Sequence, residues 1–291
     1  MKIVILGANG QLGKCFNDQF INTRHEVIYL KKIDLNVCDF NKTKKKLTTL
    51  NPDLVINSSA YTDVDNAEKN ERLANNINYL AVENIANICM HIDSWLIHLS
   101  TDYVFDGTST SPYKESDRVN PQGVYGNTKL KGEKSIQTIG CKHIILRTSW
   151  VFSEYGKNFI KTMIQLGFKN EEIKVVNDQI GCPTYAQDIA KAIVNIVSKI
   201  KSDKKSCIYH YCGNEPCSWY DFAKVIFDEA KSLKMKTPKI LTPIQTSDYP
   251  TLAKRPAYSV LNCYKIQSDY GILESNWRHG IKNILAKLKQ V

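Results

Sequence analysis

A tyrosine and a lysine four residues apart, Tyr125 and Lys129, form the pair in this sequence best suited to proton transfer. Residues at positions i and i+4 share one face of a helix. A phenol has a pKa of about 10 and exchanges its proton poorly at neutral pH unless the phenolate is stabilised. A neighbouring ammonium group provides that stabilisation through its charge. The spacing therefore predicts an acid–base pair in which Lys129 lowers the pKa of Tyr125.

A threonine, Thr101, follows the apolar run Leu96–Leu99, which predicts a buried strand. In α/β proteins, ligands bind at the carboxyl ends of parallel strands. We therefore expect the Thr101 hydroxyl to lie in the same site as Tyr125 and Lys129. The Tyr–Lys spacing occurs by chance in many proteins, so the prediction depends on its combination with Thr101 and with a glycine loop near the start of the chain.

That loop contains Gly7, Gly10 and Gly13, between the apolar run Ile3–Leu6 and the helical pattern Leu12–Phe20. Glycines in such a turn permit a tight bend, close approach of the backbone to a pyrophosphate, and close packing of helix on strand. The free N–H groups of the helix then face the anion. The spacing is GxxGxxG instead of GxGxxG, so its place between a strand and a helix carries the prediction of a dinucleotide site.

Two lysines, Lys31 and Lys32, follow the second predicted strand, Val27–Leu30. A site that prefers NAD usually has Asp or Glu at this point, where the carboxylate binds the ribose hydroxyls. Two cations would instead attract a 2′-phosphate, so we expect NADPH as the cofactor, with NADH as the alternative. The other interpretation is that both lysines simply face water.

The elements around these residues alternate between short strands and helices. Helical patterns, among them Leu12–Phe20 and Leu73–Met90, separate five apolar runs: Ile3–Leu6, Val27–Leu30, Leu54–Asn57, Leu96–Leu99 and Ile144–Arg147. This order predicts βαβ units in an α/β protein with a Rossmann-type, doubly wound parallel sheet. We expect an NADP(H)-binding domain over residues 1–150 and a smaller substrate-binding domain over residues 151–291, with some later segments returning to the first domain.

The chain is basic, because 39 Lys and Arg residues against 29 Asp and Glu residues give a net charge of +10 in 291 residues. The lysines are scattered in separate polar stretches, without the aromatic residues that accompany nucleic-acid surfaces. No apolar run reaches the ~20 residues that a membrane span needs. The first apolar run is too short for a signal peptide. We therefore expect no nucleic-acid partner, no membrane association and a cytoplasmic location.

Nine cysteines are spread along the chain, and in an unsecreted protein we expect them to be reduced. The group Cys207, His210, Cys212 and Cys217 has the residue types of a metal site. It lacks the CxxC pairs of zinc sites, however, and the predicted strand Ile208–Tyr211 would send neighbouring side chains to opposite faces. We expect no metal.

Taken together, these segments resemble a known family over nearly the whole chain. The sequence resembles the extended short-chain dehydrogenase/reductases, and most closely the dTDP-4-dehydrorhamnose reductases among them. The resemblance rests on these segments: GANGQLG (7–13), NSSAYT (57–62), VDNAE (64–68), STDYVFDG (100–107), YGNTKLKGE (125–133), RTSW (147–150), DQIGCPT (178–184) and RPAYS (255–259).

The resemblance implies hydride transfer from a reduced nicotinamide to carbon 4 of dTDP-4-dehydro-β-L-rhamnose, which gives dTDP-β-L-rhamnose. It also implies that Tyr125 protonates the alkoxide, that Lys129 grips the nicotinamide ribose, and that Thr101 binds the sugar oxygen. Asp102 and Trp150 would contact the nucleotide sugar. The remaining cofactor contacts implied are Gly10, Gln11, Leu12, Asp39, Phe40, Ala60, Tyr61 and Thr62.

The sequence departs from the family at Cys15. Some members dimerise through magnesium held partly by a Glu at this position, so we expect no such metal, and a homodimer stays open. Sugar dehydratases place Asp-Glu after the threonine, whereas this chain has Asp102 and Tyr103, which argues against dehydration. A reductase of another nucleotide 4-keto-6-deoxysugar and a non-catalytic regulatory homologue remain as alternatives.

Overall fold

The computed structural model describes residues 1–200 and 206–289. All five predicted strands are confirmed: β1 (Lys2–Leu6), β2 (Glu26–Leu30), β3 (Leu54–Asn57), β4 (Trp95–Thr101) and β5 (His143–Thr148). A sixth strand, β10 (Cys207–His210), pairs with β5, and the sheet order is β10-β5-β4-β3-β1-β2. Every neighbouring pair is parallel. The predicted doubly wound parallel sheet is therefore confirmed, with one strand beyond β1 where the full Rossmann order has two.

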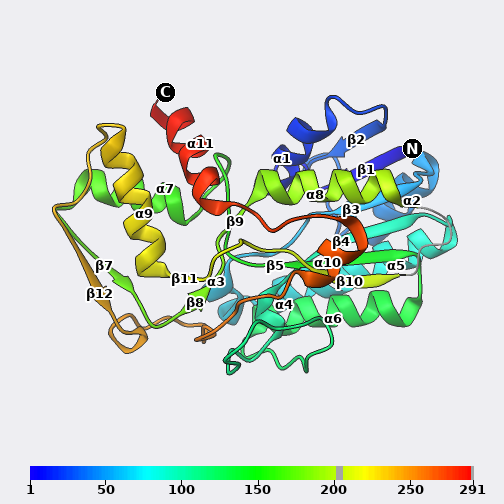
Figure 1. Ribbon diagram of the computed structural model, residues 1–291. Coiled ribbons are helices and arrows are strands. Elements are labelled where there is room, and N and C mark those ends of the chain that lie inside the picture. Colours follow the sequence, from blue (N-terminus) through cyan, green and yellow to red (C-terminus); the bar gives the residue numbers. More distant parts are fainter. Residues whose placement is uncertain (201–205, 290–291) are drawn as a thin grey trace.

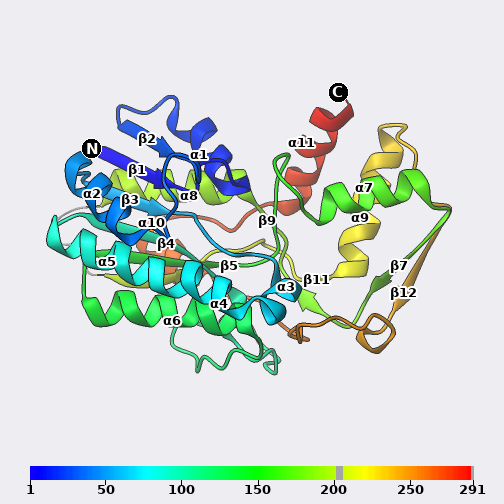
Figure 2. The ribbon, with the colours of Figure 1, turned by 180° about the vertical axis from the view of Figure 1, so that it is seen from behind.

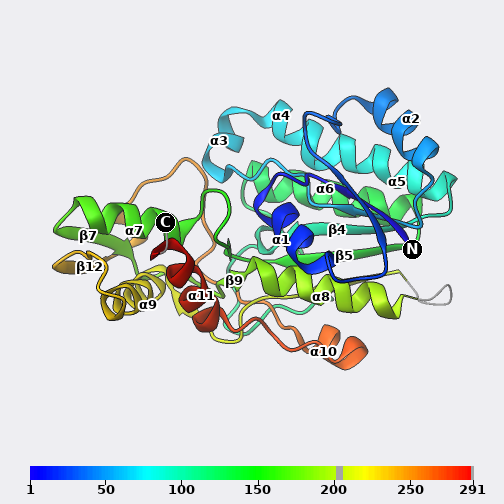
Figure 3. The same ribbon diagram turned by 90° about the horizontal axis from the view of Figure 1, so that it is seen from above.

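Helices cover both faces of this sheet (Figures 2 and 3). One face packs against α1 (Gln11–Phe20) and α8 (Ala186–Lys199), and the other against α2 (Phe40–Leu50), α5 (Ala81–His91) and α6 (Val124–Ile139). Alternate residues of β1 supply the two cores, since Ile3 and Ile5 belong to the first and Val4 and Leu6 to the second. Both faces of β1 are apolar because both are covered.

The helical pattern Leu73–Met90 is interrupted. It begins in α4 (Glu71–Asn75), passes through a π-helical turn, η1 (Asn76–Leu80), and continues as α5, while α3 (Val64–Lys69) precedes it. Asn78 in the π-helical turn is fully buried. Its side chain bonds the backbone of Tyr61 and the hydroxyl of Thr128. This turn therefore joins the loop after β3 to helix α6.

A second unit lies beside the sheet, on the left of Figure 1. Its own core contains Phe152, Ile160, Phe222 and Trp277. Its helices and longer strands are α7 (Phe159–Lys169), β7 (Glu172–Val176), α9 (Trp219–Ser232), β12 (Ile240–Ile244) and α11 (Trp277–Lys289). Two short pairs lie between the units: β6 (Val151–Phe152) with β9 (Thr184–Tyr185), and β8 (Ile180–Gly181) with β11 (Cys217–Ser218).

The chain enters the second unit more than once. After residue 150, helix α8 packs against α1 and strand β10 joins the large sheet. Helix α10 (Tyr264–Tyr270) then packs against β10 and α8. Two short 3-10 turns complete the elements, η2 (Asp102–Val104) and η3 (Thr246–Asp248). The sheet-containing unit is therefore built from residues on both sides of position 150.

Candidate active site

The glycine loop makes the tight turn that its sequence predicts. Gly7 has a positive φ of +79°, and a Cβ there would lie 2.9 Å from the Ser59 nitrogen. A Cβ on Gly13 would lie 2.5 Å from the Gly7 carbonyl oxygen, so this position holds the first turn of α1 against the loop. Gly10 is the N-cap residue of α1 and has no side chain over the helix end. The backbone here is open to an anion.

A cavity of about 200 Å³ lies against this loop. Its lining consists of Gly7, Asn9, Gly10, Lys32, Leu35, Asn36, Val37, Ser58, Ser59, Ala60 and Ile77. Three predicted cofactor residues, Gly7, Gly10 and Ala60, are thus brought together. Lys32 also lines the cavity, whereas Lys31 is exposed and is not part of the lining.

The other predicted cofactor residues are not part of the cavity lining. Asp39 is the N-cap of α2, and its carboxylate accepts from the Lys42 N–H and pairs with the Lys42 ammonium at 3.1 Å. These contacts lower the pKa of Asp39. Phe40 is 38% exposed. Asp39 and Phe40 do not line the cavity, so their place beside adenine stays a prediction.

Gln11 and Leu12 stand at the start of α1. The Gln11 amide donates to the Val151 carbonyl at 3.2 Å and accepts from Asn158 at 2.8 Å, which joins the glycine loop to the second unit. Leu12 packs against the core on that face of the sheet. Tyr61 is held through its backbone by Asn78, and Thr62 is exposed in the loop after β3.

The predicted catalytic threonine is the last residue of β4. The Thr101 hydroxyl donates to the adjacent Asp102 carboxylate at 3.0 Å and accepts from the Tyr103 N–H at 3.2 Å. Tyr125 lies near Thr101, whose hydroxyl acts to lower the pKa of the Tyr125 phenol. Strand β4 and helix α6 therefore bring together Thr101, Asp102 and Tyr125, as the sequence predicts.

Burial determines the protonation of Tyr125 and Asp102. Burial is the main cause of the raised pKa of Tyr125. The Thr101 side chain acts to lower this pKa, and the charge of Asp102 raises it further. Burial likewise raises the pKa of Asp102 to about 6. Ser259 acts in the opposite direction on Asp102. Within the described residues, however, Asp102 Oδ2 and Ser259 Oγ have no partner at bonding distance. Because its pKa is raised, Tyr125 holds its proton at neutral pH.

Lys129 is 2% exposed and lies one helical turn after Tyr125. Its ammonium donates to the Leu99 carbonyl at 2.5 Å and contacts His98 Nε2 at 3.2 Å. Burial lowers the pKa of Lys129 to about 8, while the charge of Glu133 opposes this shift. His98 has a strongly lowered pKa, because it is buried and faces Lys129, and is therefore neutral. The Leu99 carbonyl and His98 are the groups that hold the Lys129 ammonium. The predicted lowering of the pKa of Tyr125 by Lys129 therefore stays a prediction.

Behind Lys129, Glu133 forms a buried ion pair with Arg147 of β5 at 2.7 Å. The Glu133 carboxylate also accepts from the Ser100 hydroxyl. Trp150, the predicted substrate contact, follows β5 and is partly exposed. Its indole stacks on Trp219, with ring centroids 3.4 Å apart.

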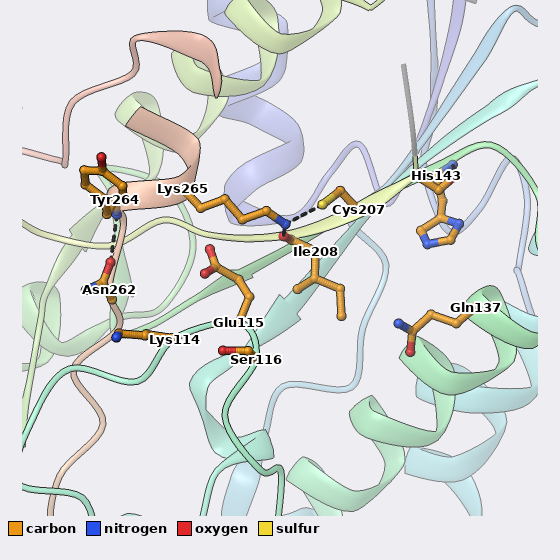
Figure 4. A pocket seen from close by; sticks show the side chains of 11 residues that line it. Lys114, Glu115, Ser116, Gln137, His143, Cys207, Ile208, Asn262, Tyr264 and Lys265 are labelled. Atoms are coloured by element: carbon orange, nitrogen blue, oxygen red, sulfur yellow. Dashed lines mark hydrogen bonds between the residues drawn. The ribbon is translucent and has the colours of Figure 1, made fainter. Parts of the chain in front are cut away.

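A larger hollow, of about 780 Å³, lies along the outer edge of β10 (Figure 4). None of the predicted site residues lines it. There the Lys265 ammonium contacts the Cys207 thiol and donates to the Ile208 carbonyl, while Glu115 accepts from the His210 N–H. These side chains occupy backbone groups of an edge strand, which protects it from pairing with another chain. Its size alone does not make this hollow the active site.

Several residues of the site are missed by sequence reasoning: Asn78, His98, Asn158, Trp219 and Ser259. Asn158 shows one usable signal, because it begins α7 as an N-cap, but its contact with Gln11 comes from distant packing. Within residues 1–200 and 206–289, no group of three His, Cys, Asp or Glu side chains is placed to hold a metal. In the same range, none of the helices has the length and apolar character needed to cross a bilayer.

The doubly wound sheet, the glycine turn and the Thr–Tyr–Lys group define an enzyme fold of the extended short-chain dehydrogenase/reductase class. The family model described as "RmlD substrate binding domain" matches residues 1–290. The chain belongs to this family, which confirms the resemblance inferred from its motifs.

Individual relatives agree with this assignment. A dTDP-4-dehydrorhamnose reductase from Aggregatibacter actinomycetemcomitans is 44% identical over 290 residues, which cover 98% of each chain. The solved structure of a dTDP-4-dehydrorhamnose reductase from Clostridium acetobutylicum is 37% identical with a TM-score of 0.92, covering 99% of this chain and 100% of that one. The enzyme of the same name from Bacillus anthracis, solved in complex with NADP, is 34% identical with a TM-score of 0.90, covering 98% and 99%.

Proposed function

We propose that this protein reduces the 4-keto group of dTDP-4-dehydro-β-L-rhamnose with NADPH and so forms dTDP-β-L-rhamnose, the last step in making this sugar donor. The observation that carries the proposal is the position of Thr101 and buried Asp102 at the carboxyl end of β4, where the Thr101 hydroxyl donates to Asp102 and both side chains act on the pKa of Tyr125. The names and identities of the relatives support the choice of substrate.

The glycine loop fits a dinucleotide, because a Cβ on Gly7 or Gly13 would collide with neighbouring backbone and the cavity beside the loop is lined by Gly7, Gly10 and Ala60. When bound, the reduced nicotinamide supplies the hydride. We assign Gly7, Gly10, Gln11, Leu12 and Gly13 to the pyrophosphate side. Further cofactor contacts are assigned to Lys31, Asp39, Phe40, Ala60, Tyr61 and Thr62. Lys32, which lines the cavity, is assigned to the 2′-phosphate together with Lys31.

The chain's own residues manage the proton. Hydride addition to a ketone leaves negative charge on the sugar oxygen, and Tyr125 donates its phenolic proton to that oxygen. Thr101 bonds the same oxygen and orients it. Lys129, with its pKa lowered to about 8, is assigned to the ribose and to stabilising the phenolate that remains. The other sugar contacts are assigned to Asp102 and Trp150.

The two units divide this work in our proposal. The NADP(H)-binding part comprises residues 1–150 with later segments, and the substrate-binding part comes from residues 151–291. We place the enzyme in the cytoplasm, which its nine free cysteines support. Its assembly as a homodimer would not use a metal at position 15, because Cys15 is fully buried and burial raises the pKa of its thiol.

Substitution of Tyr125 by Phe tests the proposal. The ring and its T-shaped packing on Tyr103 are kept, at a centroid distance of 5.6 Å, while the transferable proton is lost. We expect kcat to fall by about 10²–10⁴-fold, as for other general acids, while NADPH binding is unchanged. Turnover is followed by NADPH absorbance with enzymatically prepared ketosugar, and the product is identified by NMR.

Tyr79→Phe is the matched control, because it removes a phenol whose hydroxyl donates to Glu83, outside the proposed site. It should retain wild-type turnover. Full activity of Tyr125→Phe, with hydride transfer shown to limit the rate, would exclude Tyr125 as the acid. A wild-type protein that binds NADPH and leaves the ketosugar unreduced would refute the proposed reaction.

A further inference from the structure

Trp150 has an unfavourable backbone conformation. Its φ of +45° lies in the left-handed region, which residues with a Cβ adopt only when their surroundings hold them there. The Trp150 carbonyl accepts a hydrogen bond from the Thr184 N–H at 3.2 Å, which fixes one side of the peptide. Strained residues of this kind are concentrated at ligand sites. The contacts of the indole show what else holds it.

Trp219 stacks flat on the Trp150 indole, with centroids 3.4 Å apart and planes inclined by 5°. Phe159 in turn packs against Trp219 at 4.6 Å. Trp219 is the first residue of α9, whose start is fixed by a capping box between Ser218 and Asp221. The stacking partner therefore stands at a rigid helix end, which limits the positions open to the Trp150 ring.

Gly181 provides the space for the same ring. A Cβ on Gly181 would lie 2.5 Å from Trp150 Cε2 and 2.7 Å from its Nε1, closer than side-chain atoms approach each other. Gly181 pairs with Cys217, two residues before Trp219, in the β8–β11 sheet. The glycine and the segment that leads into the stacking tryptophan are therefore connected by strand pairing.

The β8–β11 pair also reaches the other side of the site. The neighbouring Ile180 donates its N–H to the Ala257 carbonyl at 2.7 Å, and its own carbonyl accepts from the Ser259 N–H at 2.8 Å. Ser259 is the residue whose hydroxyl influences Asp102. The segments 178–184 and 255–259 thereby connect Gly181, beside the Trp150 ring, to Ser259, near Asp102, through backbone hydrogen bonds.

We propose that Trp219 and Gly181 are positioning residues that hold the Trp150 indole in the single orientation in which it contacts the nucleotide sugar. The inference rests on the proposed function, because it takes Trp150 as a substrate contact. It gives a role to the DQIGCPT segment, residues 178–184, and to a tryptophan outside all the motifs of the resemblance. Neither Trp219 nor Gly181 need touch the reacting atoms.

The stack can be observed without any turnover. Two indoles in face-to-face contact couple their electronic transitions and give a paired positive and negative band in the far-ultraviolet circular dichroism when their transition moments are twisted relative to each other. The four tryptophans include Trp95, which is buried and has no aromatic partner within the described residues. Trp219→Leu should abolish the paired band, whereas the control Trp95→Phe should retain it. A Trp219→Leu spectrum that keeps the paired band of the wild type would refute the assignment of that band to the stack.

Kinetics then test positioning. We expect Trp219→Leu and Gly181→Ala to lower kcat/KM for the ketosugar by between about tenfold and a hundredfold, the effect of a displaced substrate contact. The KM for NADPH should stay unchanged, and Trp219→Phe, which keeps an aromatic ring, should recover most of the loss. Urea unfolding identifies any variant that has lost its fold, and Trp219→Phe remains informative in that case.

The outcomes separate this inference from the proposed reaction. If Trp219→Leu loses the paired band yet keeps wild-type kcat/KM for the ketosugar, the positioning role is wrong while the reaction stands. If the wild type reduces no ketosugar, the proposed reaction fails, and the spectra together with calorimetric binding of dTDP-rhamnose still test the indole pair. Equal losses in the KM for NADPH and for the sugar would indicate a general structural effect and would also overturn the inference.

Discussion

We predict that ionised Asp102 lowers the stability of the protein at neutral pH, so that its replacement by Asn stabilises the fold. The carboxyl is 2% exposed, and burial raises its pKa from 3.8 to about 6. Because the pKa is raised, the folded state binds this proton more tightly than the unfolded state does. The resulting stabilisation is complete below pH 3.8 and is lost as the pH rises through about 6.

The magnitude follows from the shift of roughly two pKa units. At about 1.4 kcal/mol per unit, the ionised carboxylate costs about 3 kcal/mol above pH 7. Asn keeps the acceptor for the Thr101 hydroxyl and places an amide near Ser259 Oγ, which has no partner among the described residues. We therefore expect Asp102→Asn to raise the free energy of unfolding by about 1–3 kcal/mol at pH 8, less at pH 5, and to lower turnover.

Urea unfolding at pH 8 and pH 5 measures the difference directly. Asp106→Asn serves as the control with opposite sign, because hydrogen bonds from Thr108 lower the pKa of Asp106 to about 2. That carboxylate stabilises the fold above the unfolded pKa of 3.8, so Asp106→Asn should destabilise the protein at pH 8. An Asp102→Asn variant less stable than wild type by the same amount at both pH values would refute the reasoning.

Two further predictions concern charge. Arg147→Met leaves Glu133 buried without its partner, so we expect the free energy of unfolding in urea to fall by about 3–5 kcal/mol. Adding Glu133→Leu should recover most of this loss. A loss below about 1 kcal/mol would show that the pair is dispensable. Lys32 lines the cofactor cavity and Lys31 does not, so Lys32→Ala should reduce the preference for NADPH over NADH by about five- to thirtyfold and Lys31→Ala by much less. Equal ratios of kcat/KM for the two cofactors in wild type and Lys32→Ala would contradict this assignment.

Local sequence signals were sufficient for the framework of the protein. The five strands are short apolar runs bounded by polar or turn residues, and their alternation with helices leaves few architectures open. The glycine turn was predictable because the structure has no room for a Cβ at Gly7 or Gly13, and glycine is the residue that lacks one. Thr101 and Tyr125 could be named from the sequence because short-range periodicity fixes a strand end and a helix face.

The tertiary structure alone decided which distant residues complete the site. Trp219 meets Trp150, and Ser259 approaches Asp102, only after β8, β11 and the segment at 255–259 have paired. The orientation of the Lys129 ammonium toward His98, and the choice of Lys32 over Lys31 at the cavity, also lie outside any local pattern. Periodicity and turn chemistry depend on a few neighbouring residues. Burial, pKa and side-chain contacts depend on what the whole fold packs around a group, so they cannot be obtained from neighbours in the sequence.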